Sequence, residues 1–306
     1  MQLSGGHMAD VSKMPFLENS MIVAAHADDE ILWFNSIAAD VGQVIVVYCD
    51  FWAHPELGSA RIAAFAEYPR ENVVCLKIDE SGAAGCANWA SPQLTDYGMA
   101  LGVEANRRAL MRLAKKSLSM VAAYDRDRIA GESVLSAYRR NFDAICDALR
   151  PKLRPEMNVF THNPWGEYGH EEHIQVFRVL DKLRGEIGFR LWISNYCTDR
   201  AMPLAQRYFR SEPAEYVRLP CNKAFAEQVA SVYKKHGCWT WADDWVWFDD
   251  ECFMEAPREH SRDEPHRHLF PLNFFSIGDF AQRKGWLPFA VTATAASVAL
   301  AATMAD

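Results

Sequence analysis

The chain has 306 residues, of which 50% are hydrophobic and 24% charged, a composition typical of a globular protein with a sizeable core. Its formal net charge of -8 argues against nucleic acid or an anionic membrane surface as a partner, because both attract basic faces. The eight cysteines are dispersed without a C-x-x-C pair, which argues against a zinc ribbon or a disulfide framework and favours free thiols in the cytoplasm.

The two ends of the chain differ from its middle. The opening "MQLSGGHMAD" lacks both the basic and the apolar region of a signal peptide, and we assign residues 1–14 to a tag remnant and a disordered start. Residues 287–306 are uncharged until the final aspartate but rich in Ala and Thr rather than Leu and Ile, which favours a tail over a membrane anchor. With no repeat or linker between them, residues 15–286 are expected to form a single domain.

Strand and helix patterns alternate along this domain. Runs rich in β-branched residues predict strands at 21–25, 43–49, 72–78, 157–162, 189–196 and 214–220. Longer periodic segments predict helices at 30–42, 132–151 and 222–235. Residues 79–104 are rich in turn formers and predict a loop excursion near the site. The alternation predicts a Rossmann-like, three-layer α/β/α fold with a mostly parallel sheet.

The first chemical motif follows the first predicted strand. In "MIVAAHADDEILWF", residues 21–34, His26 is followed by the acids Asp28 and Asp29 where the strand ends. Ligands of doubly wound sheets bind outside the carboxyl ends of the strands. The alternative is that the acids only cap the next helix, where they meet a favourable dipole. That alternative does not explain the histidine, so we interpret the stretch as functional.

The second motif, "THNPWGEYGHEEHIQVFRVL" at 161–180, also follows a predicted strand. His170 and His173 are three residues apart at the start of a helical pattern, so they face one side of a helical turn. Taken alone, this spacing is weaker than the H-E-x-x-H of zinc proteases, and a pair of surface histidines is the alternative.

Together the motifs supply the ligands of a catalytic zinc site: two imidazoles and one carboxylate, with a spare carboxylate and a spare imidazole beside them. Such sites have three protein ligands and leave one position open for water, whose pKa zinc lowers to about 7. A neighbouring carboxylate can take the proton as the water attacks a carbonyl. Hydrolysis of an amide is the reaction that these groups favour.

These residues resemble the PIG-L/LmbE-like zinc-dependent N-acetylglucosaminyl deacetylases, a family marked by A-H-P-D-D-E after the first strand and a downstream G-H-x-x-H. Here the motifs are "AHADDE" at 25–30 and "GHEEH" at 169–173, with "GEY" before the second. The resemblance implies that His26, Asp29 and His173 ligate the metal. It also implies that Asp28 is the general base, and that His170 stabilises the oxyanion or protonates the leaving amine.

Two departures from the family pattern stand out. Ala27 replaces the usual proline, which loosens the turn but removes no ligand. Glu171 and Glu172 replace the commoner Pro-Asp, so Glu172 must reach one methylene further if it supports a metal ligand.

Four further residues are candidates for binding substrate. Arg61 follows the second strand, and Glu167 lies in "GEY". The resemblance suggests that the segment after a late helix lines the pocket, which adds His236 and Trp239. A surface position is the alternative for Arg61. A strand with one buried aromatic face is the alternative for the tryptophan-rich segment 239–247.

The expected function is therefore hydrolysis of the N-acetyl group of an amino sugar or small glycoconjugate by zinc-bound water. We expect one Zn²⁺ per chain, with iron, cobalt and nickel left open. A non-catalytic carbohydrate-binding relative is the main alternative, and a homo-oligomer remains open. A nucleotide-dependent enzyme is disfavoured, because acids stand after the first strand in place of G-x-G-x-x-G.

Overall fold

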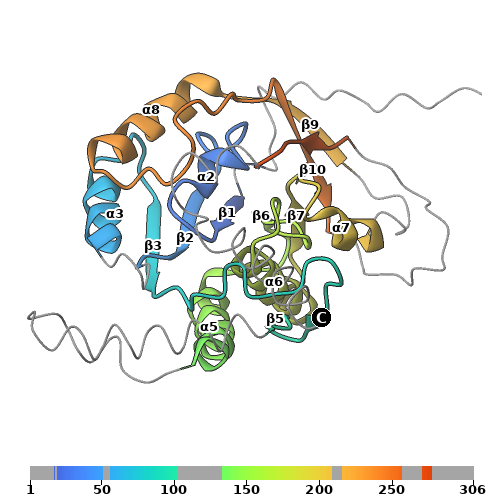
Figure 1. The fold of residues 1–306 in the computed structure, drawn as a ribbon. Helices are drawn as coiled ribbons and strands as arrows, with labels where there is room; N and C mark the ends of the chain where they lie inside the picture. The colour runs from blue at the N-terminus through green and yellow to red at the C-terminus, as the bar shows by residue number, and fades with distance from the viewer. Residues whose placement is uncertain are drawn as a thin grey trace, which may run out of the picture.

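The fold is built on one central sheet. The computed structural model describes residues 17, 19–50, 56–102, 133–208, 216–256 and 271–277, so the predicted terminal segments 1–14 and 287–306 lie outside the described residues. Seven strands form the sheet in the order β3-β2-β1-β6-β7-β10-β9 (Figure 1). The predicted α/β class with a mostly parallel sheet is confirmed.

The strands that form this sheet are β1 (Ser20–Ala24), β2 (Gln43–Tyr48), β3 (Val73–Ile78), β6 (Asn158–Thr161), β7 (Arg190–Ile193), β9 (Tyr216–Pro220) and β10 (Asp250–Glu255). The first five pair in parallel, whereas β10 is antiparallel to both of its neighbours. Two small sheets join β4 (Leu94–Thr95) to β5 (Gly98–Met99) and β8 (Tyr196–Cys197) to β11 (Asn273–Phe274).

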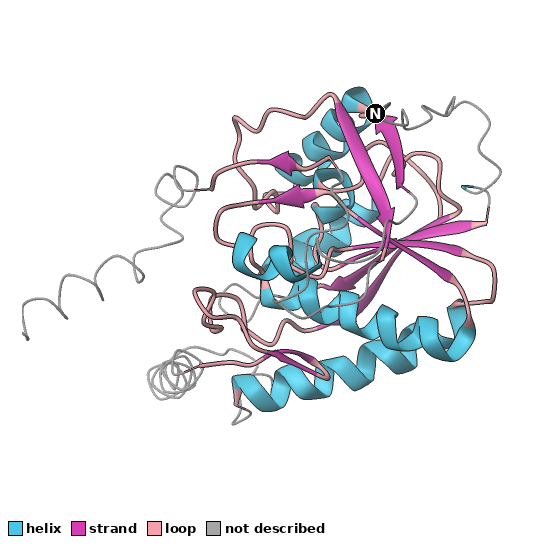
Figure 2. Cartoon of the chain, turned by 90° about the vertical axis from the view of Figure 1, so that its right-hand side faces the viewer, coloured by secondary structure: helices cyan, strands magenta, loops and turns pink. Residues whose placement is uncertain are grey.

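The helices cover both faces of the sheet, as the view in Figure 2 makes plain. They are α2 (Asp29–Leu32), α3 (Glu56–Ala66), α5 (Val134–Leu149) with the 3-10 turn η3 (Arg150–Lys152), α6 (Glu171–Ile187), α7 (Met202–Tyr208) and α8 (Lys223–Lys235). Helices α5 and α6 pack against one face, and α3 and α8 lie on the other (Figure 1).

Alternate residues of β1 enter two separate hydrophobic cores. Met21 and Val23 belong to the core beneath α5 and α6, whereas Ile22 and Ala24 belong to the core beneath α8. Side chains of a strand alternate between faces, so a strand buried on both sides must be apolar throughout. This explains why the first strand has a continuous apolar sequence rather than an alternating one.

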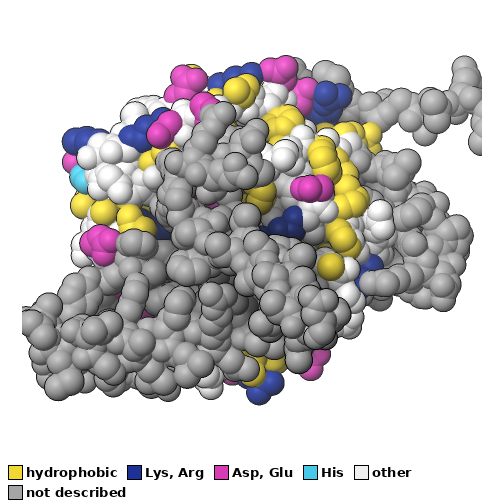
Figure 3. Space-filling view, viewed as in Figure 1, with side chains coloured by type: hydrophobic (Ala, Val, Ile, Leu, Met, Phe, Trp, Pro, Cys, Tyr) yellow, Lys and Arg dark blue, Asp and Glu magenta, His cyan; other side chains and the backbone are white. Residues whose placement is uncertain are grey.

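Helix α8 is amphipathic in the expected way. Its buried residues are Ala226, Val229, Ala230 and Tyr233, at the spacing of one helix face. Asn222 caps its first turn by accepting a hydrogen bond from the backbone N–H of Phe225 at 3.2 Å. Acidic and basic side chains are interspersed along the upper edge of the molecule, over this helix (Figure 3).

The helix predicted at 30–42 is wrong in its length, because α2 ends at Leu32 and turns follow. The backbone N–H groups of Asn35 and Ser36 donate instead to the carboxylate of Glu251 on β10, at 3.2 and 2.9 Å. Backbone donors bound by a distant side chain are not available to continue the helical ladder. A tertiary contact thus overrides the local pattern.

The tryptophan-rich segment 239–247 does not form the strand considered from the sequence. Its backbone is irregular, and the adjacent strand β10 begins only at Asp250, where no strand was predicted. The ring of Trp241 lies 5.4 Å from that of Trp33, so the aromatic residues pack as a cluster rather than along one strand face.

No helix in the described part of the chain combines the length and apolar character needed to cross a membrane.

Candidate metal centre

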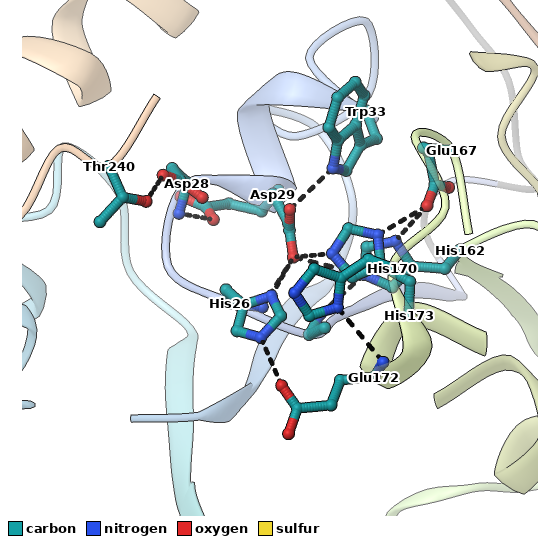
Figure 4. A network of polar contacts seen from close by, with 12 residues as sticks. His26, Asp28, Asp29, Trp33, His162, Glu167, His170, Glu172, His173 and Thr240 are labelled. Atoms are coloured by element: carbon teal, nitrogen blue, oxygen red, sulfur yellow. Dashed lines mark hydrogen bonds and ion pairs between the residues drawn. The ribbon is translucent and has the colours of Figure 1, made fainter. Parts of the chain in front are cut away.

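The two predicted motifs meet because β1 and β6 are parallel neighbours. Val23 pairs with Thr161, so the residues that follow both strands emerge at the same edge of the sheet. His26 follows β1, and His162, His170 and His173 follow β6. The ring centroids lie 5.3 Å apart for His26 and His173, 4.7 Å for His170 and His173, and 3.9 Å for His162 and His173 (Figure 4).

Asp29 lies at the centre of these imidazoles. Its Oδ2 is 3.1 Å from Nδ1 of His26 and 3.2 Å from Nε2 of His173, and its Oδ1 accepts a hydrogen bond from Trp33 Nε1 at 2.7 Å. Burial acts to raise the pKa of Asp29, but the charge of His173 and hydrogen bonds from the imidazoles outweigh it and hold the pKa well below its usual value. The carboxylate is therefore an anion placed between two histidines.

His173 has the surroundings of a metal ligand. Its Nδ1 lies 2.7 Å from Oε2 of Glu167, and its buried Nε2 lies 3.2 Å from Oδ2 of Asp29. A metal-bound histidine commonly gives its second nitrogen to a carboxylate in this way. An imidazole nitrogen and a carboxylate oxygen are both ligand types that zinc accepts, and here the two lie side by side. The residues present thus fit a metal ion.

Three groups of side chains could hold such an ion, each with its ligand atoms within 4.8 Å of one another. The groups are His26 with His170 and His173, Asp29 with His162 and His173, and His26 with Glu80 and Glu172. They overlap around the predicted ligands His26, Asp29 and His173, and the contacts of Asp29 bring those three together. This part of the protein can hold a metal ion.

His162 supports this centre although the sequence analysis did not identify it. Its Nε2 accepts a hydrogen bond from the backbone N–H of Ala25 at 2.8 Å, and its Nδ1 lies 3.0 Å from Oε2 of Glu167. Both ring nitrogens therefore have partners within the protein. Burial and the charge of His173 lower the pKa of His162, which keeps the imidazole neutral.

Glu172 contacts His26, although it is one methylene longer than the aspartate usual at this position of the motif. Its Oε2 lies 3.3 Å from Nε2 of His26, and its Oε1 accepts hydrogen bonds from the backbone and the hydroxyl of Ser81, both at 2.7 Å. Ser81 lies in the predicted loop excursion, which therefore reaches the site. The contact leaves Nδ1 of His26 directed toward Asp29.

Asp28 is held apart from the imidazoles. Its backbone has φ 106°, a conformation that residues other than glycine rarely adopt, and its Oδ2 accepts a hydrogen bond from the Thr240 hydroxyl at 2.6 Å (Figure 4). Burial and the charge of Asp29 raise the pKa of Asp28 to about 7. A carboxyl group with such a pKa can exchange a proton near neutral pH.

His170 caps α6 and presents a single nitrogen to the site. Its Nδ1 accepts a hydrogen bond from the backbone N–H of Glu172 at 3.2 Å, so the neutral ring carries its hydrogen on Nε2. Burial and the charges of His173 and His26 hold its pKa well below the usual value. The turn before it requires Gly166, whose φ is +65° and whose added Cβ would lie 2.6 Å from the carbonyl oxygen of His170.

Two of the four predicted substrate contacts lie close to this centre. Arg61 is only 3% exposed, so the surface alternative is wrong; its NH1 donates to Glu80 Oε1 at 3.0 Å, and that oxygen is 3.9 Å from His26 Nε2. Glu167 instead lies behind the imidazoles. Its Oε2 faces His162 and His173, and its Oε1 accepts from Asn163 and Ser194, which leaves neither oxygen for the predicted substrate contact.

The other two predicted contacts lie elsewhere. His236 ends α8, with Nε2 3.2 Å from Oε1 of Glu67. Trp239 lies beneath Nζ of Lys234, 5.5 Å from its ring centroid. Neither contact is with a metal ligand, so these contacts do not join His236 or Trp239 to the metal centre.

The segment after α8 does reach the site, but through other residues. Thr240 binds Asp28, and the ring of Trp241 lies 5.3 Å from that of Tyr168, which in turn lies 5.2 Å from that of His173. His162 is the last residue of the strand predicted at 157–162, and Glu80 lies two residues after the strand predicted at 72–78, so the strand-end criterion applied to His26 could have found both. Thr240 carried no comparable signal, because its role depends on how the chain turns after α8.

Comparison of the chain with models of known protein families and with curated proteins gave no match. The two motifs and the geometry of the site are therefore the observations on which function is argued.

Proposed function

We propose that the chain is a metal-dependent hydrolase that removes the N-acetyl group from an amino sugar or a small glycoconjugate. One Zn²⁺ would be held by His26, Asp29 and His173, with other divalent metals as alternatives. When bound, the ion supplies Lewis acidity to the substrate carbonyl and to the attacking water.

The observation that carries the proposal is the separation of the two adjacent aspartates. Asp29 contacts His26 and His173 through Oδ2, whereas Asp28 turns to Thr240. No donor in the described part of the chain contacts Oδ1 of Asp28. In the proposal, Asp28 takes a proton from the water that attacks the amide, and Asp29 is a ligand of the metal.

In this proposal His170 acts on the oxygen of the substrate carbonyl. Its Nε2–H can donate to the oxygen of the tetrahedral carbon, where negative charge develops. Collapse of this carbon breaks the C–N bond, and the leaving amine takes up the proton that the water gave to Asp28. Acetate and the free amino sugar are then released.

A sugar suits the aromatic residues beside the centre. Tyr168 and Trp241 have ring centroids 5.3 Å apart, and Tyr168 lies 5.6 Å from the ring of His170. Such rings offer flat apolar surfaces to the faces of a sugar. We also propose the cytoplasm as the compartment, because all eight cysteines are free thiols.

Mass spectrometry on a panel of N-acetylated sugars incubated with the zinc-loaded protein tests the proposal. We expect one sugar or sugar class to lose a single acetyl group, and the control Asp28→Asn to remove it at least about 100-fold more slowly. Sugar binding without loss of acetyl from any member of the panel would support the non-catalytic carbohydrate-binding alternative instead.

A further inference from the structure

Thr240 makes a contact with the proposed catalytic base that links distant parts of the chain. Its hydroxyl donates to Oδ2 of Asp28 at 2.6 Å across 212 positions of sequence. Among the described residues, this is the one side chain that gives the carboxylate a hydrogen bond. One oxygen of Asp28 is thus held by the protein, and no donor in the described part of the chain holds the other.

The turn after α8 delivers Thr240 to this position. Gly237 has φ +69°, and its N–H donates to the carbonyl of Lys234 at 3.1 Å, while the N–H of Cys238 donates to the carbonyl of Tyr233 at 2.9 Å. These two bonds form a Schellman motif, in which glycine adopts the left-handed conformation without steric cost. The motif ends the helix and redirects the chain toward Asp28.

Helix α8 also holds the backbone of Asp28. The hydroxyl of Tyr233 donates to Oε1 of Glu30 at 2.6 Å, and Oε2 of Glu30 accepts the backbone N–H of Asp28 at 3.0 Å. Through Tyr233 and Thr240, this helix and its terminal turn fix both the main chain and the side chain of Asp28. A group held at both ends has little freedom to leave its geometry.

We infer that Thr240 is a positioning residue that fixes the plane of the Asp28 carboxylate, so that Oδ1 faces the attacking water. The inference rests on the proposed function, in which Asp28 accepts a proton. The torsion that turns an aspartate carboxylate is broad, and without a hydrogen bond the two oxygens exchange places. Proton transfer depends on correct orientation of the reacting atoms, so loss of the bond slows the chemical step.

The first test compares Thr240→Val, which keeps the shape but removes the hydroxyl, with Thr240→Ser, which keeps the donor. We expect Thr240→Val to lower kcat by about 10- to 100-fold with KM and zinc content unchanged, and Thr240→Ser to restore at least half of the activity. Thr95→Val is the matched control, because Thr95 is also half-buried and also donates one hydrogen bond, to the carbonyl of Gly98 at 3.2 Å. Melting temperatures of all three variants report whether each is folded.

A double-mutant cycle separates positioning from packing. If Thr240 acts through Asp28, Thr240→Val has no further effect on the residual activity of Asp28→Asn. Equal losses in Thr240→Val and Thr240→Ser, an effect on KM alone, or full activity of Thr240→Val would each overturn the inference. Failure of the native protein to deacetylate any sugar would instead overturn the proposed function, and this inference with it.

Discussion

Asp28 and Asp29 are adjacent in the chain, yet their carboxylates have different surroundings (Figure 4). The left-handed backbone of Asp28 turns its side chain toward Thr240, while Asp29 begins α2 and faces the imidazoles. Strained backbone of this kind persists only where surrounding contacts hold it, and it is concentrated at functional sites. In the proposed mechanism, this backbone allows one of two neighbouring acids to bind the metal and the other to take the proton.

His170 has two roles that substitution can separate. As the cap of α6 it accepts the N–H of Glu172, and as a donor it presents Nε2 to the site. Asparagine is a good helix cap but lacks the imidazole. We therefore expect His170→Asn to keep its stability and its zinc while losing activity about 100-fold. His170→Ala should in addition lose about 1 kcal/mol of stability.

Zinc content and turnover measured on both His170 variants check this prediction. Loss of the metal from His170→Asn would show that His170 is a ligand and would contradict the role given to it.

Glu167 fixes the orientation of two imidazoles. Burial acts to raise its pKa, but the charges of His162 and His173 and the hydrogen bonds from their rings lower it to about 2. Both oxygens of Glu167 accept hydrogen bonds. In Glu167→Gln, an NH₂ group replaces one of these oxygens and faces N–H or O–H donors that it cannot bind. We expect zinc affinity to fall by about 10- to 100-fold, measured by competition with a chelator. Glu255→Gln, the same change at a half-exposed position, should leave the affinity unaltered, and an equal affinity in both variants would refute the role of Glu167.

At the level of elements, the site is made by the adjacency of β1 and β6 and stabilised by loops that reach in from either side. Residues 79–102 approach from one side, and the segment after α8 from the other. The sheet supplies the position of each histidine, and the loops supply the contacts that hold the rings and carboxylates in place.

Glu171 anchors the first of these loops. Its carboxylate accepts the backbone N–H groups of Gly85 and Ala87, both at 2.8 Å, and the indole N–H of Trp89 at 3.0 Å. We expect Glu171→Ala to release the loop and raise amide exchange at Gly85 and Ala87 about tenfold or more, with zinc content unchanged. Hydrogen exchange followed by mass spectrometry over 82–90 checks this, with the exposed change Glu186→Ala as the control. Unaltered exchange would mean that other contacts hold the loop.

Glu251 joins β10 to the turn that ends α2, and it makes stability depend on pH. Burial raises its pKa from 4.5 to about 7, even though Asn35, Ser36 and Tyr196 donate to it. A carboxyl group with a raised folded pKa binds its proton more tightly in the folded chain. Its contribution to the free energy of unfolding is therefore full below pH 4.5 and is lost as the pH rises through about 7.

Glu251→Gln cannot ionise and lacks this dependence. We expect the stability advantage of the native protein over the variant to shrink by about 2.5 kcal/mol between about pH 5 and pH 8, measured by urea unfolding. Parallel stability curves for the two proteins would rule out titration of Glu251 in this range.

At the scale of the whole molecule, the sequence predicts the strands and helices whose bounds depend on nearby residues. The apolar runs of β1 and β2 and the capped helix α8 lie within two residues of their predicted bounds. His26, Asp29, His170 and His173 also converge as expected, because parallel strands end at one edge of a sheet. The helix at 30–42 was predicted too long because Glu251 binds its backbone from far along the chain. The contact of Thr240 with Asp28 could not be predicted for the same reason, because it joins residues 212 positions apart in the chain.

The central proposal is that Asp29 is a metal ligand and that Asp28 is the general base. Zinc content per chain after dialysis, determined side by side on the native protein, Asp28→Asn and Asp29→Ala, tests it most directly. We expect about one zinc ion per chain in the native protein and in Asp28→Asn, and little in Asp29→Ala. Zinc retained by Asp29→Ala but lost from Asp28→Asn would contradict this division, as would a native protein that binds none.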